Sequence, residues 1–142
     1  MKRGKFIVIT GGDGVGKTTC LKLLEPKLKD EFGDGVIFAK EPGGTDVGQK
    51  IREILLTKDD VGMDLKTEMF LFAASRAQQI YQKIKPSLEQ GNHVVCDRFV
   101  ESSFAYQVRG SVRPDLEKTF HVVDDITDGA KPDLYIVLDL DP

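Results

Sequence analysis

Four short runs of aliphatic and β-branched residues stand out along the chain because polar residues do not alternate with them. The runs are Phe6–Ile9, Val36–Ala39, Val94–Cys96 and Leu134–Leu140. A strand that is apolar on both faces is typical of a parallel sheet covered by helices on both sides. The pattern therefore predicts four strands that are buried on both faces.

Helical patterns lie between these runs, over Lys17 to about Asp30, Thr45 to about Leu56, Asp64 to about Lys85, Phe99–Gln107 and Pro114–Val123. In the longest one, Asp64 is the expected N-cap and Pro86 the expected end. Strands that alternate with helices predict an α/β fold, a parallel sheet flanked by helices. No repeat or linker interrupts the pattern, so one domain is expected over residues 1–142.

Composition and charge narrow the range of functions. The 142 residues are 40% hydrophobic and 30% charged, with a formal net charge of −3. This balance argues against a nucleic-acid or anionic-membrane partner, and no apolar stretch is long enough to span a bilayer. Cys20 and Cys96 stand beside apolar residues and are expected to be buried thiols in a reducing, cytoplasmic compartment.

The first apolar run leads into Gly11-Gly12-Asp13-Gly14-Val15-Gly16-Lys17-Thr18, which matches the phosphate-loop pattern G-x-x-x-x-G-K-S/T at every fixed position. Glycines let successive N–H groups converge on phosphate oxygens, and the following helix N-terminus adds positive charge. We expect Lys17 to reach the β- and γ-phosphates and Thr18 to bind Mg²⁺. The alternative, a glycine turn with a surface lysine, does not explain the strand-to-helix context. A nucleotide site is predicted over Gly11–Thr19.

A second polar pair follows the third apolar run. Asp97 and Arg98 come directly after Val94–Cys96, at the sheet edge where ligands bind in α/β folds. An aspartate there can organise Mg²⁺, and an arginine can stabilise transferring phosphoryl oxygens. The alternative is a solvated pair that caps the next helix.

The long predicted helix carries an apolar stripe that contains one charge. Leu65, Met69, Phe72, Ile80 and Ile84 recur at three- and four-residue steps, and Arg76 lies in the same stripe. A guanidinium in an apolar stripe is costly unless it is paired or lines a wet cleft. Phe72 by itself is most often a core residue, and Arg76 makes a binding pocket the favoured interpretation.

Other polar features are less specific. The turn Glu41–Thr45, before a helix with Arg52, is equally typical of a capped turn and of a binding loop. Lys58–Asp60 and the segment of Arg109 and Arg113 are expected at the solvated surface. Neither of the two histidines stands in the sequence with the further ligands that a metal site needs.

Taken together, these motifs resemble thymidylate kinase, a nucleoside monophosphate kinase family, of the bacterial type. The resemblance runs over almost the whole chain, through five motifs: Gly11–Thr18, Glu41–Thr45, Leu71–Gln78, Asp97–Phe99 and Ser102–Gln107. It implies a P-loop nucleoside monophosphate kinase fold, with ATP as the phosphoryl donor, dTMP as the acceptor and Mg²⁺ as the metal. Family members are commonly homodimers, but the sequence marks no dimer face.

The resemblance also implies roles for single residues. Phe72 would stack on thymine, and Arg76 would hydrogen-bond its carbonyl edge. Arg52 and Arg98 would hold the acceptor phosphate. The remaining predicted substrate contacts, to the sugar, the base or the metal shell, are Asp13, Glu41, Asp97, Ser103, Tyr106 and Gln107.

The reaction itself is assigned to three residues, Lys17, Arg98 and Asp13, with Thr18 and Asp97 at the metal. Tyr106 would disfavour ribonucleotides by crowding the 2′ position. Catalysis would then consist mostly of positioning and charge stabilisation.

Several positions depart from the family pattern. Thr10 stands where many relatives carry glutamate, Lys40 replaces the usual arginine, and Val108 stands where bacterial relatives tend to place glycine. Family chains also continue beyond Pro142 into a further strand and a basic lid. From the sequence we therefore expect an incomplete C-terminus, with the last strand and lid missing. This leaves two alternatives open, a nucleotide-binding fragment with little turnover and a kinase for another deoxynucleotide.

Overall fold

A computed structural model describes residues 2–57, 62–110, 115–126 and 130–139. The predictions for Lys58–Asp60 and Arg113, and those for the last residues of the chain, lie outside these ranges. Arg109 is described, and its exposed side chain pairs with Glu117 at 3.6 Å.

The sheet has four parallel strands in the order β2-β3-β1-β4. Their bounds are β1 Phe6–Gly11, β2 Val36–Lys40, β3 His93–Asp97 and β4 Leu134–Leu138. Ile9 of β1 lies opposite Asp97 of β3 and Ile136 of β4, so the carboxyl ends of these strands meet at one edge. The predicted parallel α/β fold is confirmed.

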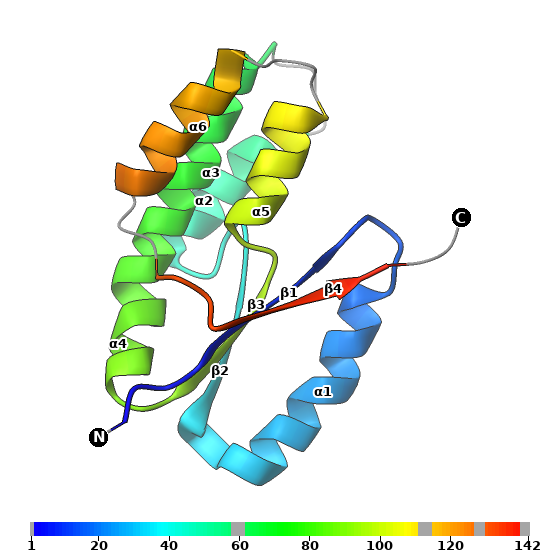
Figure 1. The fold of residues 1–142 in the computed structure, drawn as a ribbon, viewed down its shortest axis with the longest axis vertical. Helices are drawn as coiled ribbons and strands as arrows, with labels where there is room; N and C mark the ends of the chain where they lie inside the picture. Colours follow the sequence, from blue (N-terminus) through cyan, green and yellow to red (C-terminus); the bar gives the residue numbers. More distant parts are fainter. Residues whose placement is uncertain (1, 58–61, 111–114, 127–129, 140–142) are drawn as a thin grey trace.

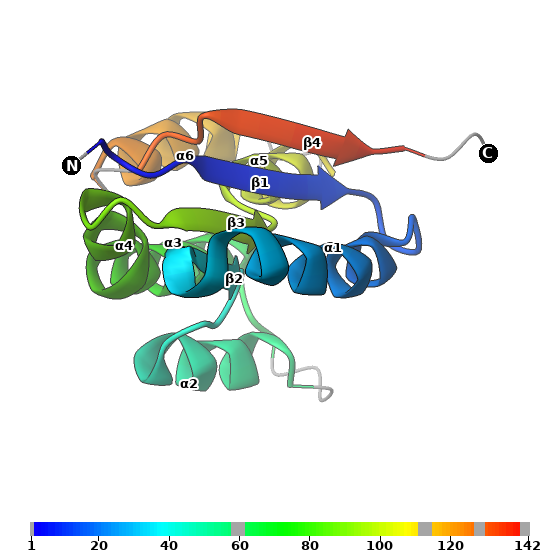
Figure 2. The same ribbon diagram turned by 90° about the horizontal axis from the view of Figure 1, so that it is seen from below.

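The helices are α1 Lys17–Phe32, α2 Asp46–Leu55, α3 Leu65–Gln79, α4 Lys85–Glu89, α5 Val100–Ser103 and α6 Asp115–Ile126. A 3₁₀ turn, Gly33–Gly35, follows α1, and π-helical segments follow α3 (Ile80–Ile84) and α5 (Phe104–Arg109). In Figures 1 and 2, α1 lies on one side of the sheet, and α3 to α6 gather on the other. The layers are those of a parallel sheet flanked by helices.

The core follows from this layering. On the α1 side, Ile9, Val36 and Val95 pack against the leucines of α1. On the other side, Phe6, Val8, Val94 and Cys96 pack against the segment from Ile80 to Leu88. A third cluster joins Met69 of α3 to Val108 and to Leu116 and Phe120 of α6. The central strands β1 and β3 are thus apolar on both faces, as predicted.

The prediction of burial on both faces holds only in part for the edge strand β2, in which Val36 alone is buried, and it is wrong for the fourth strand. β4 is an edge strand that pairs with β1, and Val137 is 66% exposed. The α1 leucines pack over the other three strands and reach only Leu138 of β4, so its other side chains stay exposed. An uninterrupted apolar run therefore did not indicate burial in this strand.

The prediction that Pro86 ends the long helix is also wrong. The Asp64 carboxylate caps α3 by accepting a hydrogen bond from Lys66 N at 2.9 Å, as expected. After Gln79 the chain passes through the π-helical segment and continues as α4 to Glu89. Pro86 stands in the first turn of α4, directly after the π-helical segment, and the helix continues through it to Glu89.

The two cysteines differ in how deeply they are buried. Cys96 is buried in the sheet as predicted, but Cys20 on α1 is only partly buried, and both are free. The expectation of two buried thiols is therefore correct only for Cys96, since α1 rests on the sheet through one stripe of leucines.

Candidate functional site

The phosphate loop joins β1 to α1, as the motif predicted. Gly16 is the N-cap of α1 and has a φ of 89°, in the left-handed region where glycine is favoured. The Lys17 ammonium donates hydrogen bonds to the carbonyl oxygens of Gly11, at 3.0 Å, and Gly12. The loop thus holds its own lysine close to the N-terminus of α1, where anions bind.

A cavity of about 390 Å³ opens on this loop. It is lined by Asp13, Gly14, Gly16, Lys17, Thr18, Asp97 and Arg98. The other predicted nucleotide contacts, at Gly11, Gly12, Val15 and Thr19, belong to the same loop and helix turn but not to this lining. The cavity therefore joins the phosphate loop to the end of β3.

A second cavity, of about 420 Å³, lies beside the first. The predicted substrate residues that line it are Glu41, Arg52, Phe72, Asp97, Arg98, Ser103, Tyr106 and Gln107. These side chains come from the loop after β2, from α2 and α3, and from the last residue of β3 and the segment after it. The structure thus brings together residues that are far apart in the sequence.

The two cavities share the residues Asp13, Asp97 and Arg98. The Arg98 guanidinium forms an ion pair with Asp13 and lies 5.2 Å from the centre of the Tyr106 ring. The Tyr106 hydroxyl is 3.4 Å from Asp13 Oδ2. A ligand in one cavity would therefore be separated from a ligand in the other by these few polar side chains.

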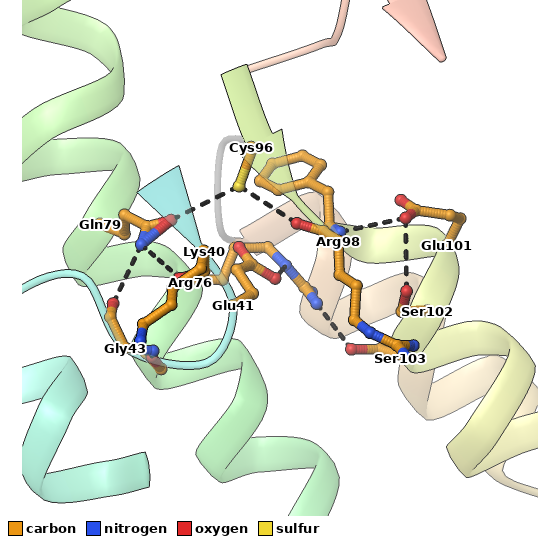
Figure 3. Close-up of polar contacts among 12 residues, drawn as sticks. Lys40, Glu41, Gly43, Arg76, Gln79, Cys96, Arg98, Glu101, Ser102 and Ser103 are labelled. Carbon is orange, nitrogen blue, oxygen red and sulfur yellow. Dashed lines mark hydrogen bonds and ion pairs between the residues drawn. The ribbon is translucent and has the colours of Figure 1, made fainter. Parts of the chain in front are cut away.

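Arg76 is not among the residues that line either cavity. Its Nε donates to Glu41 Oε2 at 3.0 Å, and its Nη2 donates to Ser103 Oγ at 2.6 Å (Figure 3). It is paired, which was one of the two ways to offset the cost of a charge in an apolar stripe. The direct contact between Arg76 and a base stays a prediction.

Burial raises the pKa of Glu41 to about 7, against the pull of the Arg76 guanidinium. Glu41 Oε1 is buried and has no hydrogen-bond partner among the described residues, which explains why desolvation outweighs the ion pair. Glu41 therefore exchanges a proton close to neutral pH while it lines the larger cavity.

The loop from Glu41 to Gly44, a weak motif in the sequence, is held from several sides. Gln79 Nε2 donates to the carbonyl oxygens of Lys40 and Gly43, at 2.8 and 3.0 Å. Arg52 Nη1 donates to Pro42 O at 2.9 Å. These bonds give the turn one conformation, with the Glu41 carboxylate over α3.

Several lining residues of the larger cavity were not predicted. They are Lys40, Pro42, Leu56, Glu68, Phe99 and Ser102. Glu68 is the most informative, because it accepts a hydrogen bond from Gln107 Nε2 at 2.9 Å. It lies four residues before Phe72 on α3, so the helical period could have placed both side chains on one face.

The residues with the chemistry to hold a hard cation are Thr18 and Asp97, which line the same cavity. Asp97 Oδ1 is buried and has no hydrogen-bond partner among the described residues. Within that part of the chain, no group of three or more histidine, cysteine or acidic residues gathers as a metal cage. Magnesium is commonly held by one or two carboxylates and the phosphates of a nucleotide, so the residues present fit Mg²⁺.

Every helix among the described residues is too short or too polar to span a membrane.

Comparison with known proteins gives one consistent result. The thymidylate kinase family model matches residues 9–142. The thymidylate kinase of an Exiguobacterium species is 46% identical over 139 residues, which cover 98% of this chain and 65% of that protein. The thymidylate kinase of Caldanaerobacter subterraneus is 47% identical over 141 residues, 99% of this chain and 66% of that protein.

A solved structure shares the fold. The crystal structure of thymidylate kinase from Ehrlichia chaffeensis matches with a TM-score of 0.86 at 35% identity, over 98% of this chain and 74% of that chain. The chain therefore spans about two thirds of the length of the curated relatives named above.

Proposed function

The chain belongs to the thymidylate kinase family, and on that basis we propose that it transfers the γ-phosphoryl group of ATP to dTMP. The observation that carries the proposal is the junction of the two cavities at Asp13, Asp97 and Arg98. Phosphoryl transfer between two nucleotides needs donor and acceptor sites that open onto each other. The products are ADP and dTDP.

The donor site is the smaller cavity. Backbone N–H groups of the phosphate loop and the Lys17 ammonium bind the phosphates of ATP, next to the positive end of α1. Thr18 and Asp97 would hold Mg²⁺, and the metal would supply neutralising charge for the phosphates of ATP. The phosphate loop itself holds the phosphates of ATP in position.

The acceptor site is the larger cavity. Phe72 offers an aromatic face for thymine, and Ser103 and Gln107 offer polar groups for the base and sugar. Arg52 and Arg98 supply positive charge for the phosphate of dTMP. An aromatic side chain and two guanidinium groups in one lining fit a nucleoside monophosphate.

At the junction, a phosphate oxygen of dTMP attacks the γ-phosphorus, and the bond to the oxygen bridging the β- and γ-phosphates breaks. The transferring group carries its charge on three oxygens, so donors placed around it lower the barrier. Arg98 lines both cavities and is the side chain we assign to this charge. Its pairing with Asp13 holds the guanidinium at the junction.

The test is direct product analysis. The purified protein is incubated with ATP, MgCl₂ and dTMP, and dTDP is measured by ion-exchange chromatography, with dCMP, dUMP and dGMP in parallel. We expect dTDP as the preferred product, and its loss in Arg98→Ala. Tight binding of ATP and dTMP by calorimetry without any dTDP would instead support a binding module. Preferred turnover of another nucleotide would contradict the assignment of the acceptor.

Two further expectations belong to this proposal. A homodimer is implied by the family, and light scattering after size-exclusion chromatography measures it. A cytoplasmic location is implied by the substrates and can be followed by cell fractionation.

A further inference from the structure

The backbone of Arg98 is in the left-handed region, with a φ of 68°. No other described residue except glycines has a positive φ. A residue with a Cβ adopts this conformation at a cost in free energy, so it persists where the surrounding contacts hold it. The side chain at this position is one of the three that line both cavities.

Three hydrogen bonds hold the backbone turn at Arg98, which we call the Arg98 corner; Figure 3 draws the two that involve Cys96 and Glu101. Arg98 N donates to Ile9 O of the neighbouring strand at 3.0 Å. The Cys96 thiol donates to Arg98 O at 3.1 Å, and burial raises the pKa of this thiol, which keeps its proton in place. On the other side of the same peptide group, Phe99 N donates to Glu101 Oε1 at 3.0 Å.

The peptide group between Arg98 and Phe99 is therefore bound at both its carbonyl and its N–H. Rotation of this peptide plane changes ψ of Arg98, and with it the direction in which the chain presents the guanidinium. Phe99 cannot shift to compensate, because its ring is buried and packs edge-on against Phe6, with centroids 5.1 Å apart. Of the three bonds, the one to Glu101 is the only one made by a carboxylate.

We propose that Glu101 is a positioning residue for phosphoryl transfer, which acts by holding the Arg98 corner. The inference rests on the proposed function, in which Arg98 binds the phosphate of dTMP. Glu101 itself does not line either cavity, so it does not touch the substrates. Its Oε1 also accepts a hydrogen bond from the hydroxyl of Ser102 at 3.4 Å, and we assign its effect on the phosphate of dTMP to the backbone of Arg98.

A plain helix cap would make the same hydrogen bond. Glu101 is in the first turn of α5, where an acidic side chain is favourable in any helix. A cap would lower stability when removed and would disturb every ligand of the cavity alike. A positioning residue affects the contact with phosphate selectively, and this difference can be measured.

The first experiment compares dTMP with thymidine, which lacks the phosphate. Calorimetry with Glu101→Ala should show dTMP binding weaker by about tenfold or more, the usual range for a lost hydrogen bond to a charged group. Thymidine binding should stay within about twofold. Glu101→Gln keeps an oxygen that can accept from Phe99 N, so it should restore most of the dTMP affinity.

Glu89→Ala is the matched control. Glu89 is an exposed glutamate at the end of α4, before β3, and the cavities lie beyond the other end of that strand. It should bind both ligands like the unmodified protein. Circular dichroism of all variants shows whether each one is folded.

The second experiment is a double-mutant cycle with Arg98→Ala. If Glu101 acts through Arg98, adding Glu101→Ala to Arg98→Ala should cost no further dTMP affinity. Full additivity of the two losses would overturn the inference, as would an equal loss of thymidine and dTMP in Glu101→Ala. If the unmodified protein bound thymidine and dTMP equally, the phosphate role of Arg98 would fail and the proposed function with it. These outcomes are distinguishable because the last one concerns the unmodified protein.

Discussion

The carboxylate of Glu41 accepts a hydrogen bond from Arg76 Nε at 3.0 Å, and the two side chains are only 5% and 3% exposed. This ion pair joins the loop after β2 to α3 beneath the larger cavity. Two charges that are out of contact with water depend on each other, since each would be costly to bury alone.

Replacing Arg76 by methionine should therefore destabilise the fold. The apolar stem is kept while the buried Glu41 loses its partner, and we expect a loss of about 3–5 kcal/mol at pH 8. Urea unfolding followed by circular dichroism measures it. Arg109→Met is the control, because the pair of Arg109 with Glu117 is exposed and should be worth about 1 kcal/mol or less. Equal losses in the two variants would contradict the role given to burial.

The Glu41 carboxyl also predicts a pH dependence. Its pKa is raised from 4.5 to about 7 in the folded protein, so the folded state holds an extra proton between these values. The free energy of unfolding should fall by a total of about 3 kcal/mol as pH rises through that window. Above the window it should level off. The measurement is the unfolding free energy of the protein minus that of Glu41→Gln, as a function of pH.

The pH dependence of stability that Asp133 contributes has the opposite sign to that of Glu41 and falls in a different pH range. Hydrogen bonds from the Phe6 amide and from Lys5 and Arg3 lower the pKa of Asp133, so its contribution is lost only as pH falls below the usual carboxyl range. The contribution of Asp133 to stability is therefore constant over the pH range in which Glu41 titrates. A difference curve that rises between pH 4.5 and 7 would contradict the raised pKa of Glu41.

Lys17→Ala should weaken ATP binding by about 10- to 100-fold, the usual effect of losing charge-assisted hydrogen bonds. The fold should survive, because within the described part of the chain the ammonium group bonds only to carbonyl oxygens of its own loop. Calorimetry with ATP and MgCl₂ measures the affinity. Lys22→Ala, on the exposed side of the same helix, removes the same charge away from the cavity and should have little effect. An unchanged affinity in Lys17→Ala would refute the donor site.

Phe72→Ala should weaken dTMP binding by about 1–3 kcal/mol, the range measured for stacking of a base on an aromatic side chain. Phe70→Ala is a close control, since Phe70 is on the same helix, is 52% exposed and does not line the cavity. Calorimetric titration with dTMP compares the two variants. Equal effects would mean that Phe72 serves the packing of α3 rather than the base.

Two glycines with nearly equal φ values should respond differently to alanine. Gly14 has a φ of 81°, and a methyl group added there would meet no described atom within 4 Å outside its own stretch of chain. Gly14→Ala should therefore cost only the strain, about 1–2 kcal/mol. Gly44 has a φ of 82°, but a methyl group there would lie 2.1 Å from Gln79 Nε2. Gln79 cannot yield easily, because its two hydrogen bonds hold the loop after β2.

Gly44→Ala should therefore cost about 1–3 kcal/mol more than Gly14→Ala. Thermal or urea unfolding of both variants gives the difference. Equal costs would mean that the loop after β2 shifts to accept the methyl group.

The features that sequence reasoning identified well are those made by neighbouring residues. The phosphate loop, the N-cap at Asp64 and the central strands β1 and β3 depend on local conformation and on side-chain period, and both can be read from consecutive positions. Pro86 was misread because the chain before it forms a π-helical segment, which the sequence pattern did not indicate, and the helix continues through the proline. β4 was misread because burial depends on which helix covers a strand.

The sequence by itself determined the phosphate loop, since its N–H groups come from consecutive residues whose geometry is local. Only the tertiary structure decided that Arg98 reaches Asp13 and that Arg76 pairs with Glu41. These contacts join segments that are far apart along the chain, and the register of the parallel strands brings them to one edge. No pattern along the chain encodes that register, because it depends on how every strand and helix packs at once.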